Sequence, residues 1–112
     1  MHLPAQAERL RIFIGEADRH DGRLLSEVIV EEARKTGLAG ATVLRGIMGY
    51  GANSRVHTSK ILRLSEDMPL VIEVVDIPEK IETFLRTLDE LVTEGLVTRE
   101  PVEVMFYRHS GG

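Results

Sequence analysis

The residues best suited to chemistry gather in one segment, residues 41–65. This segment contains no Asp or Glu, although the chain of 112 residues carries a net charge of −4. Positive charge collected in this way within an acidic chain is typical of an anion site, because clustered cations attract negative ligands. The basic side chains of the segment are Arg45, Arg55, His57, Lys60 and Arg63.

A glycine-rich turn, Gly46-Ile47-Met48-Gly49-Tyr50-Gly51, precedes most of these side chains. Glycines adopt positive φ readily and leave backbone N–H groups accessible to an anion. The spacing matches neither the dinucleotide-binding fingerprint nor the phosphate loop of NTPases, since no Gly-Lys-Ser/Thr follows. We expect Tyr50 to lie in a loop, where its ring can either stack on a planar ligand or cover the core.

Two interpretations of this segment stand side by side. The first is a solvated loop that lacks acids and needs a tight turn at a strand end. The second is a site in which backbone N–H groups and cations meet a small anionic ligand. The second interpretation assigns ligand contacts to Gly49, Tyr50, Gly51, Arg55, His57 and Lys60.

Other chemistry finds little support in the chain. Without cysteine, thiolate catalysis and Cys-ligated metal centres are excluded. The four histidines, His2, His20, His57 and His109, are far apart and form no metal-binding spacing. Thr58 and Ser59 adjoin His57, but their segment has no acid to orient it, and no paired carboxylates stand out. We therefore expect no enzymatic activity and no metal.

Length and composition indicate one compact domain over residues 1–112, with loose ends at residues 1–7 and 109–112. Apolar residues make up 43% and charged residues 29%, which disfavours disorder. The start of the chain does not resemble a signal peptide, and no apolar run approaches the roughly 18 residues of a membrane helix. We expect a cytoplasmic protein, and the negative net charge disfavours nucleic-acid binding.

The elements that must position the basic segment follow from hydrophobic periodicity. Alternation predicts a strand at residues 9–15. A helix is predicted at residues 23–36, with Asp18 or Asp21 as its cap and Gly37 as its stop. A second strand is predicted at residues 41–48, and residues 61–64 are compatible with a short extension.

The second half repeats this order. Residues 70–75 form the most apolar strand, and a helix is predicted from Pro78 to about Thr93, with Gly95 as its stop. The last extended segments are predicted at residues 96–97 and 102–107. The order β-α-β-β-α-β predicts the α+β class, a ferredoxin-like antiparallel sheet with both helices on one face.

The face of this sheet that the helices leave uncovered is unusually apolar. We expect it to carry Arg11 and Phe13, an apolar set from residues 70–75, and Glu103, Met105 and Tyr107. Burial of one such aromatic or branched side chain contributes roughly 1.5–3 kcal/mol. This pattern predicts a homo-oligomer packed through the uncovered face, although scattered exposed apolar residues are also common in monomers.

Several separated blocks resemble one bacterial and archaeal family, the domain of unknown function family 190. The likeness spans roughly residues 10–106 and preserves the order and spacing of the blocks. They are residues 37–46 (GLAGATVLRG), 49–51 (GYG), 64–76 (LSEDMPLVIEVVD), 80–81 (KI) and 94–98 (EGLVT).

The resemblance implies a PII-like fold: a ferredoxin-like subunit that forms a trimer, related to PII nitrogen-signalling proteins and to CutA divalent-cation tolerance proteins. In PII proteins a nucleotide binds in clefts between subunits, near the base of a long loop. Residues 49–61 stand where that loop would be. The PII phosphate-binding pattern before the last strand is absent, since this chain has Gly95-Leu96-Val97-Thr98-Arg99-Glu100.

Two functional hypotheses follow from the resemblance. In the first, a trimer binds a small anionic effector such as an adenine nucleotide, and its loop transmits this to a partner, for example a membrane transporter. In the alternative, the protein is a CutA-like responder to divalent metals, although the CutA cysteine and histidine pattern is absent.

Overall fold

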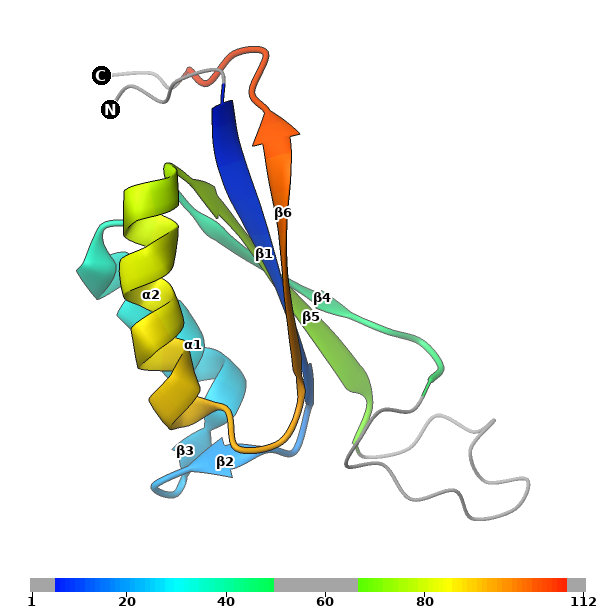
Figure 1. Cartoon of the computed structure of the whole chain (residues 1–112). Coiled ribbons are helices and arrows are strands. Elements are labelled where there is room, and N and C mark those ends of the chain that lie inside the picture. The colour runs from blue at the N-terminus through cyan, green and yellow to red at the C-terminus, as the bar shows by residue number, and fades with distance from the viewer. Residues whose placement is uncertain (1–5, 50–66, 109–112) are drawn as a thin grey trace.

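The computed structural model describes residues 6–49 and 67–108 as a two-layer α+β domain. Figure 1 shows two helices packed against one side of a twisted sheet. The elements are β1 (Gln6–Gly15), β2 (Arg19–His20), β3 (Arg23–Leu24), α1 (Leu25–Thr36), β4 (Ala41–Arg45), β5 (Pro69–Asp76), α2 (Pro78–Leu91) and β6 (Leu96–Glu103). Because β1 begins at Gln6, the predicted loose N-terminus extends two residues too far.

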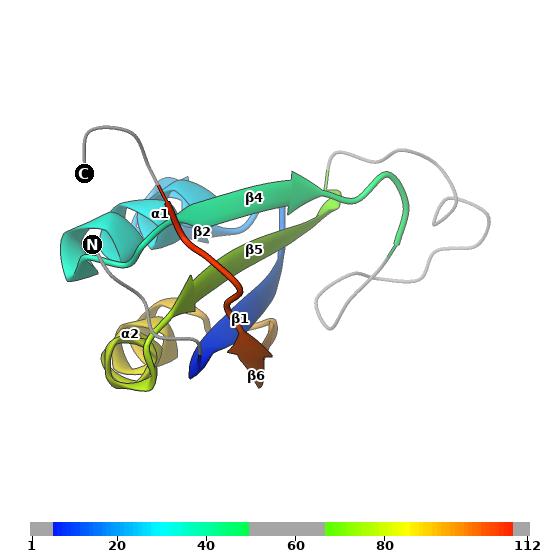
Figure 2. The ribbon, with the colours of Figure 1, turned by 90° about the horizontal axis from the view of Figure 1, so that it is seen from above.

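The main sheet has the strand order β4-β5-β1-β6, and every neighbouring pair is antiparallel. Figure 2, seen from above, shows both helices on the same side of this sheet. The predicted α+β, ferredoxin-like class is therefore confirmed. The hairpin β2–β3, a sheet of its own, lies between β1 and α1, and its second strand takes the first two residues of the helix predicted at residues 23–36.

One face of the sheet, which we call the closed face, forms the core with the helices. Even-numbered residues point to this face from Leu10 to Ile14 in β1 and from Leu70 to Asp76 in β5, as the alternating burial of these stretches shows. Apolar side chains of α1 and α2 complete the core. Its most deeply buried apolar members are Leu10, Ile12, Ile29, Ile72, Ile81 and Phe84.

The ends of α1 are set by backbone geometry more than by side-chain caps. Gly37 follows the helix in the left-handed region, with φ 83°, and its N–H donates to the carbonyl oxygens of Ala33 and Arg34. The predicted helix stop at Gly37 is confirmed. The predicted cap is wrong, because Leu24 is the N-cap and no side chain caps the helix. Asp18 instead accepts a hydrogen bond from the N–H of Gly15 at 2.9 Å.

The α2–β6 turn brings the chain close to β1. Pro78 occupies the first turn of α2, as predicted, and the helix ends at Leu91, two residues earlier than predicted. Gly95 follows with φ 149°. A Cβ at this position would lie 2.6 Å from the carbonyl oxygen of Phe13, so the approach of the two chains requires glycine.

Strand β6 corrects the sequence-based interpretation of the C-terminal region. It is one continuous strand, Leu96–Glu103, whereas two separate extended segments are predicted. Pro101 interrupts the apolar pattern in the sequence, which explains the prediction. The strand tolerates this proline because β6 is an edge strand of the sheet.

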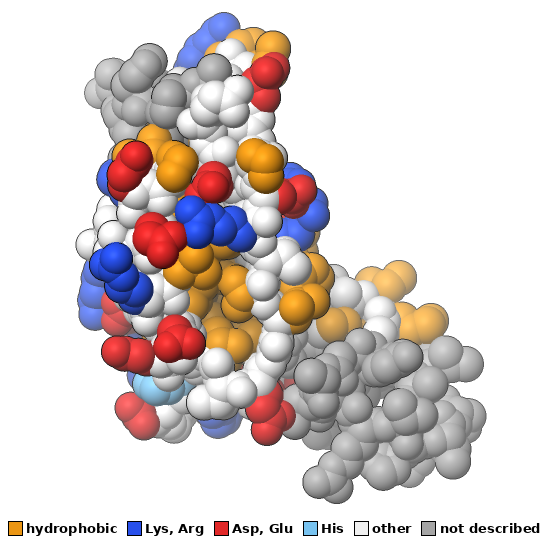
Figure 3. All heavy atoms as spheres, in the orientation of Figure 1, with side chains coloured by type: hydrophobic (Ala, Val, Ile, Leu, Met, Phe, Trp, Pro, Cys, Tyr) orange, Lys and Arg blue, Asp and Glu red, His pale blue; other side chains and the backbone are white. Residues whose placement is uncertain are grey.

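The helices cover the edge of the sheet near β6 incompletely. Figure 3 shows hydrophobic side chains at the surface between α2 and β6. Leu85, Val92 and Val97 are only partly buried where they pack on the core.

Within the described ranges, no helix is long and apolar enough to cross a membrane.

Candidate functional site

The predicted anion site falls largely outside the described residues. Tyr50, Gly51, Arg55, His57 and Lys60 all belong to residues 50–66, so their predicted role stays a prediction. The same holds for the short strand predicted at residues 61–64. Gly49 is described, and its predicted ligand contact is untested.

The base of this segment lies at one end of β4 and β5. The N–H of Gly46 donates to the carbonyl oxygen of Pro69 at 2.7 Å, and Gly49 also lies beside Pro69. Arg45 forms an ion pair with Glu16, with a distance of 3.0 Å between Nε and Oε2. The predicted second strand thus ends at Arg45, three residues earlier than expected.

The sheet face turned away from the helices, which we call the open face, is organised in rows across the strands. The strand register places Thr42, Glu73, Arg11 and Thr98 side by side, and we call them the polar row. Nearer the Pro69 end, the register aligns an apolar row of Leu44, Val71, Phe13 and Leu96. Leu44 and Leu96 in the apolar row are 49% and 56% exposed.

This arrangement both confirms and corrects the predicted composition of the uncovered face. Arg11 and Phe13 lie there, as predicted. Glu103 pairs with Gln6, whose parity in β1 puts both on the closed face. Met105 lies beyond the strand and is highly exposed. The register error follows from the predicted split of β6, because a strand shifted by one residue presents the opposite set of side chains.

An ion network joins the polar row to its neighbours on the open face. Arg11 Nε donates to Glu73 Oε2 at 2.8 Å, and Arg11 Nη1 donates to Glu100 Oε1 at 3.2 Å. Arg9 also donates to Glu100 Oε1, through Nη2 at 2.7 Å. The hydrogen bond to Glu73 raises the pKa of Arg11, and the hydrogen bond from Arg9 lowers the pKa of Glu100.

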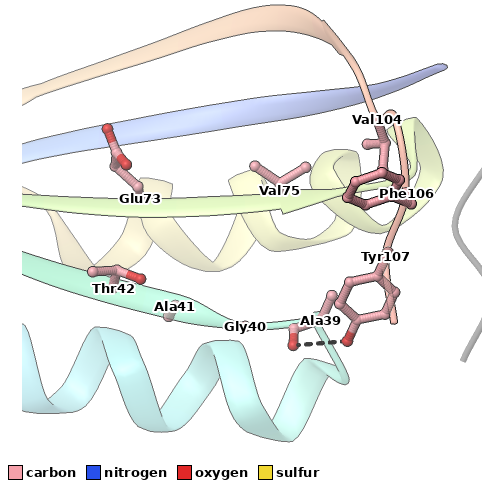
Figure 4. A pocket seen from close by; sticks show the side chains of 9 residues that line it. All are labelled: Ala39, Gly40, Ala41, Thr42, Glu73, Val75, Val104, Phe106 and Tyr107. Atoms are coloured by element: carbon pink, nitrogen blue, oxygen red, sulfur yellow. Dashed lines mark hydrogen bonds between the residues drawn. The ribbon is translucent and has the colours of Figure 1, made fainter. Parts of the chain in front are cut away.

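A pocket of about 390 Å³ opens on the same face, at the opposite end of β4 and β5 from the glycine-rich turn. In Figure 4, side chains of β4 and β5 face the C-terminal segment, residues 104–107, which crosses the end of the sheet. The residues that line the pocket are Ala39, Gly40, Ala41, Thr42, Glu73, Val75, Val104, Phe106 and Tyr107.

Two polar contacts hold the wall of the pocket formed by Ala39 and Gly40. Asp76, only 1% exposed, accepts hydrogen bonds from the N–H groups of Ala39 at 2.8 Å and Ile77 at 2.7 Å. The hydroxyl of Tyr107 donates to the carbonyl oxygen of Ala39 at 3.4 Å, as the dashed line in Figure 4 marks. The turn after α1 is thereby tied to β5 and to the C-terminal segment.

The pocket has the chemistry of a site for a small planar ligand. Val75, Val104 and the rings of Phe106 and Tyr107 supply apolar and aromatic surface, and few polar groups accompany them. Among these, Glu73 supplies a carboxylate, which accepts hydrogen bonds and does not donate them when ionised. A flat heterocycle that donates a hydrogen bond from its edge would satisfy both features.

This pocket is not predicted from the sequence, although one signal for it exists. Glu73 is the only charged residue within the predicted apolar strand, residues 70–75. A lone acid in such a strand indicates that its face is not a simple hydrophobic contact. The contribution of Phe106 depends on the chain crossing the sheet end after Glu103, which periodicity does not predict.

The alternative of a metal site gains no support from the described ranges, 6–49 and 67–108. No group of three or more His, Asp or Glu side chains in them could hold a metal ion. His20 lies near Asp21 in the β2–β3 hairpin, at 3.5 Å, and forms no larger cluster there.

The chain matches a family model described as DUF190, Uncharacterized ACR, COG1993, over residues 7–104. A UPF0166 protein of Aquifex aeolicus is 38% identical over 97 residues, which cover 87% of this chain and 91% of that protein. A UPF0166 protein of Methanocaldococcus jannaschii is 39% identical over 93 residues, covering 82% and 85%.

Among solved structures, the fold is similar to CPII from Thiomonas intermedia K12, a nitrogen regulatory PII-like protein. The superposition has a TM-score of 0.65 and covers 92% of this chain and 97% of that one, with 14% sequence identity. That structure of CPII is bound to ADP, AMP and bicarbonate. The PII-like fold implied by the family resemblance is therefore confirmed.

Proposed function

Because this chain belongs to the family described as DUF190, Uncharacterized ACR, COG1993, and has a PII-like fold, we propose that it is a PII-like signalling protein. It binds a small anionic effector, an adenine nucleotide, in clefts between the subunits of a homotrimer. It is a binding protein and not an enzyme. The pocket on the open face carries this proposal.

The pocket suits the base of such a nucleotide. Adenine has a flat apolar ring, which can stack on Phe106 or Tyr107, and an exocyclic amino group that donates hydrogen bonds. Glu73 offers the acceptor for this group at the far end of the pocket from the aromatic rings. Binding of adenine nucleotides by CPII, a protein of the same fold, supports this choice of ligand.

The phosphates are assigned to the basic segment of a neighbouring copy. The pocket lies beside Val75, while the glycine-rich turn lies beside Pro69, at the other end of β5. Six residues of extended chain separate these ends by about 20 Å. We therefore place the nucleotide where two copies join, with Arg55, His57 and Lys60 of one copy balancing the phosphate charge.

The open face provides the surface for this assembly. Its apolar row is partly exposed in one copy, and burial against a neighbour would remove this area from water. The ion network beside it is internally paired, so its burial leaves no charge without a partner. A trimer is the arrangement implied by the family resemblance.

Transmission of the signal is assigned to the segment that includes the predicted loop, residues 49–61. Nucleotide binding at its base would change its conformation, and the changed loop would bind or release a regulated protein such as a membrane transporter. The effector and the partner would then both act on this loop, the effector at its base and the partner away from it.

Calorimetric titration and thermal unfolding with ATP, ADP, AMP and cyclic nucleotides test the proposal. We expect at least one of them to stabilise the fold, by about 2.7 kcal/mol at a hundredfold excess over its Kd. Glu73→Gln should weaken this ligand about tenfold or more, because a charged hydrogen-bond acceptor is lost. Glu90→Gln, at an exposed position of α2, is the matched control and should bind as the unchanged protein does.

Three results would contradict the proposal. The absence of stabilisation at millimolar nucleotide would contradict an adenine nucleotide as the ligand. Sedimentation as a single 12.5 kDa species would contradict a binding cleft between subunits. Nucleotide turnover that His57→Ala abolishes would replace the binding protein with an enzyme.

A further inference from the structure

Arg11 occupies a special place on the open face, next to the pocket but not in it. Its guanidinium donates from Nε to Glu73 and from Nη1 to Glu100, so two carboxylates fix one planar group. Glu73 lines the pocket, whereas neither Arg11 nor Glu100 does. Arg11 is the one cation that the described residues place on the Glu73 carboxylate.

We propose that Arg11 is a positioning residue that sets the base selectivity of the pocket by holding Glu73 as a fixed hydrogen-bond acceptor. The inference rests on the proposed function, since it concerns the same pocket. A carboxylate bound to a guanidinium keeps its negative charge and its orientation. It therefore accepts a hydrogen bond from an amino-substituted base and repels a base that presents a carbonyl oxygen at the same edge.

The contacts of Glu100 explain why the arginine itself is held still. Arg9, two residues before Arg11 in β1, donates to the same oxygen of Glu100 from Nε at 3.0 Å and from Nη2 at 2.7 Å. Glu100 is thus anchored by Arg9 and in turn orients Arg11. Both arginines keep side-chain exposures of about a third, 29% for Arg9 and 37% for Arg11. Since exposed ion pairs contribute little to stability, removal of either should leave the domain folded.

Arg9 provides the matched control for Arg11. Both are arginines on the open face of β1, both pair with Glu100, and both belong to the same ion network. Arg9 is the strand partner of Val75, but of the two arginines only Arg11 donates a hydrogen bond to a side chain of the pocket, that of Glu73. An effect on the ion network or on assembly should appear when either arginine is replaced, whereas an effect through Glu73 should appear only when Arg11 is replaced.

The experiment compares AMP with IMP, which differ at the edge of the base by an amino group in place of a carbonyl oxygen. Calorimetric titrations are run on the full chain and on its Arg11→Met, Arg11→Lys and Arg9→Met variants. We expect Arg11→Met to lower the AMP-to-IMP affinity ratio about tenfold or more. Arg11→Lys should retain part of it, because lysine keeps the charge but lacks the planar fork. Arg9→Met should change the ratio less than about twofold.

A double-mutant cycle separates this role from a structural one. If Arg11 acts through Glu73, Arg11→Met should have little further effect on the ratio in a Glu73→Gln background. Equal changes in the ratio in both backgrounds, or in both arginine variants, would overturn the inference. So would an unchanged ratio in a folded Arg11→Met protein that still binds AMP. If the unchanged chain binds neither AMP nor any other adenine nucleotide, the proposed function itself fails, and the two failures are thereby distinguished.

Discussion

The two faces of the main sheet use the same strands for opposite purposes. On the closed face, Leu10, Ile12 and Ile72 are fully buried and make only apolar contacts with their neighbours and the helices. On the open face, the residues between them include both charged and apolar types, as Arg11, Phe13 and Glu73 illustrate. No residue of either set is more than one position from a member of the other.

This contrast shows that a single strand can specify the fold with its closed-face side chains and a binding surface with its open-face side chains. The closed face is defined by hydrophobic burial, which depends on area and shape, and the buried carboxylate at its end, Asp76, accepts hydrogen bonds from backbone N–H groups. The open face is defined by the placement of ion pairs and one apolar row, which determine what the sheet can contact. Substitutions at neighbouring positions of one strand should therefore have different consequences.

The largest effect is expected from a change on the closed face. Ile72→Ala leaves a cavity in the core and should lower the free energy of unfolding by about 2–5 kcal/mol. Val71→Ala, one residue earlier on the open face, should lower it by about 1 kcal/mol or less. Urea denaturation of both variants makes the comparison, and equal losses would contradict the division between the faces.

A charge in the apolar row should break assembly without unfolding the subunit. Phe13→Glu removes an aromatic side chain whose burial contributes about 1.5–3 kcal/mol, and places like charges where copies meet. We expect sedimentation velocity to show dissociation to the single chain, with an unchanged far-ultraviolet circular dichroism spectrum. Arg86→Glu, an exposed position of α2, should leave the assembly intact. A Phe13→Glu protein that sediments like the unchanged protein would argue against packing through this row.

The turn that walls the pocket provides an intermediate effect. Ala39 and Ile77 donate to different oxygens of Asp76, so Asp76→Asn, which replaces one of these oxygens with an NH₂ group, removes the acceptor of one of the two hydrogen bonds. The loss for a buried group should be about 1–3 kcal/mol in the free energy of unfolding. Thermal unfolding beside Asp89→Asn, an exposed control on α2, measures it. An Asp76→Asn protein as stable as the control would show that the turn does not depend on this carboxylate.

The smallest effect concerns pH and the ion network. The hydrogen bond from Arg9 holds the pKa of Glu100 below its ordinary value of 4.5. The contribution of the Arg9–Glu100 pair to stability is therefore fully present above pH 4.5, and it is lost as the pH falls through the lowered pKa of Glu100 in the folded state. We expect Glu100→Gln to flatten the acid side of the stability curve, measured by denaturation from pH 6 to about pH 3. Arg9→Met should flatten it similarly, and an unchanged slope in both would contradict this role of the pair.

Much of the fold was predictable because its signals are local. Alternation in residues 9–15 predicts β1, the apolar run at residues 70–75 predicts β5, and the apolar stripe from Ile81 to Leu88 predicts α2. Gly37 marks the end of α1 through a backbone conformation that glycine adopts easily. The β2–β3 hairpin and the middle of β6, residues 98–101, escaped prediction. The former is too short for periodicity, and Pro101 disguises the latter.

The site was less predictable because it depends on chain segments that meet only in three dimensions. Glu73, Ala39 and Phe106 come from three distant parts of the chain and share one pocket. No spacing rule connects them. The basic segment is visible in the sequence, because it follows from charge composition alone, but its predicted contacts fall on residues outside the described ranges. The register of β6, which places Thr98 beside Arg11, depends on pairing with β1.

Pro101 has one more consequence, for how far the sheet can be extended. Ribbon-like polymers grow because every strand added exposes a fresh edge that accepts the next, and they need two competent edges per molecule. Strand β6 forms one edge, and its proline lacks the N–H needed to complete a ladder there. Chains that join through the β4 edge alone would thus stop at a pair, and growth into a fibre would be disfavoured.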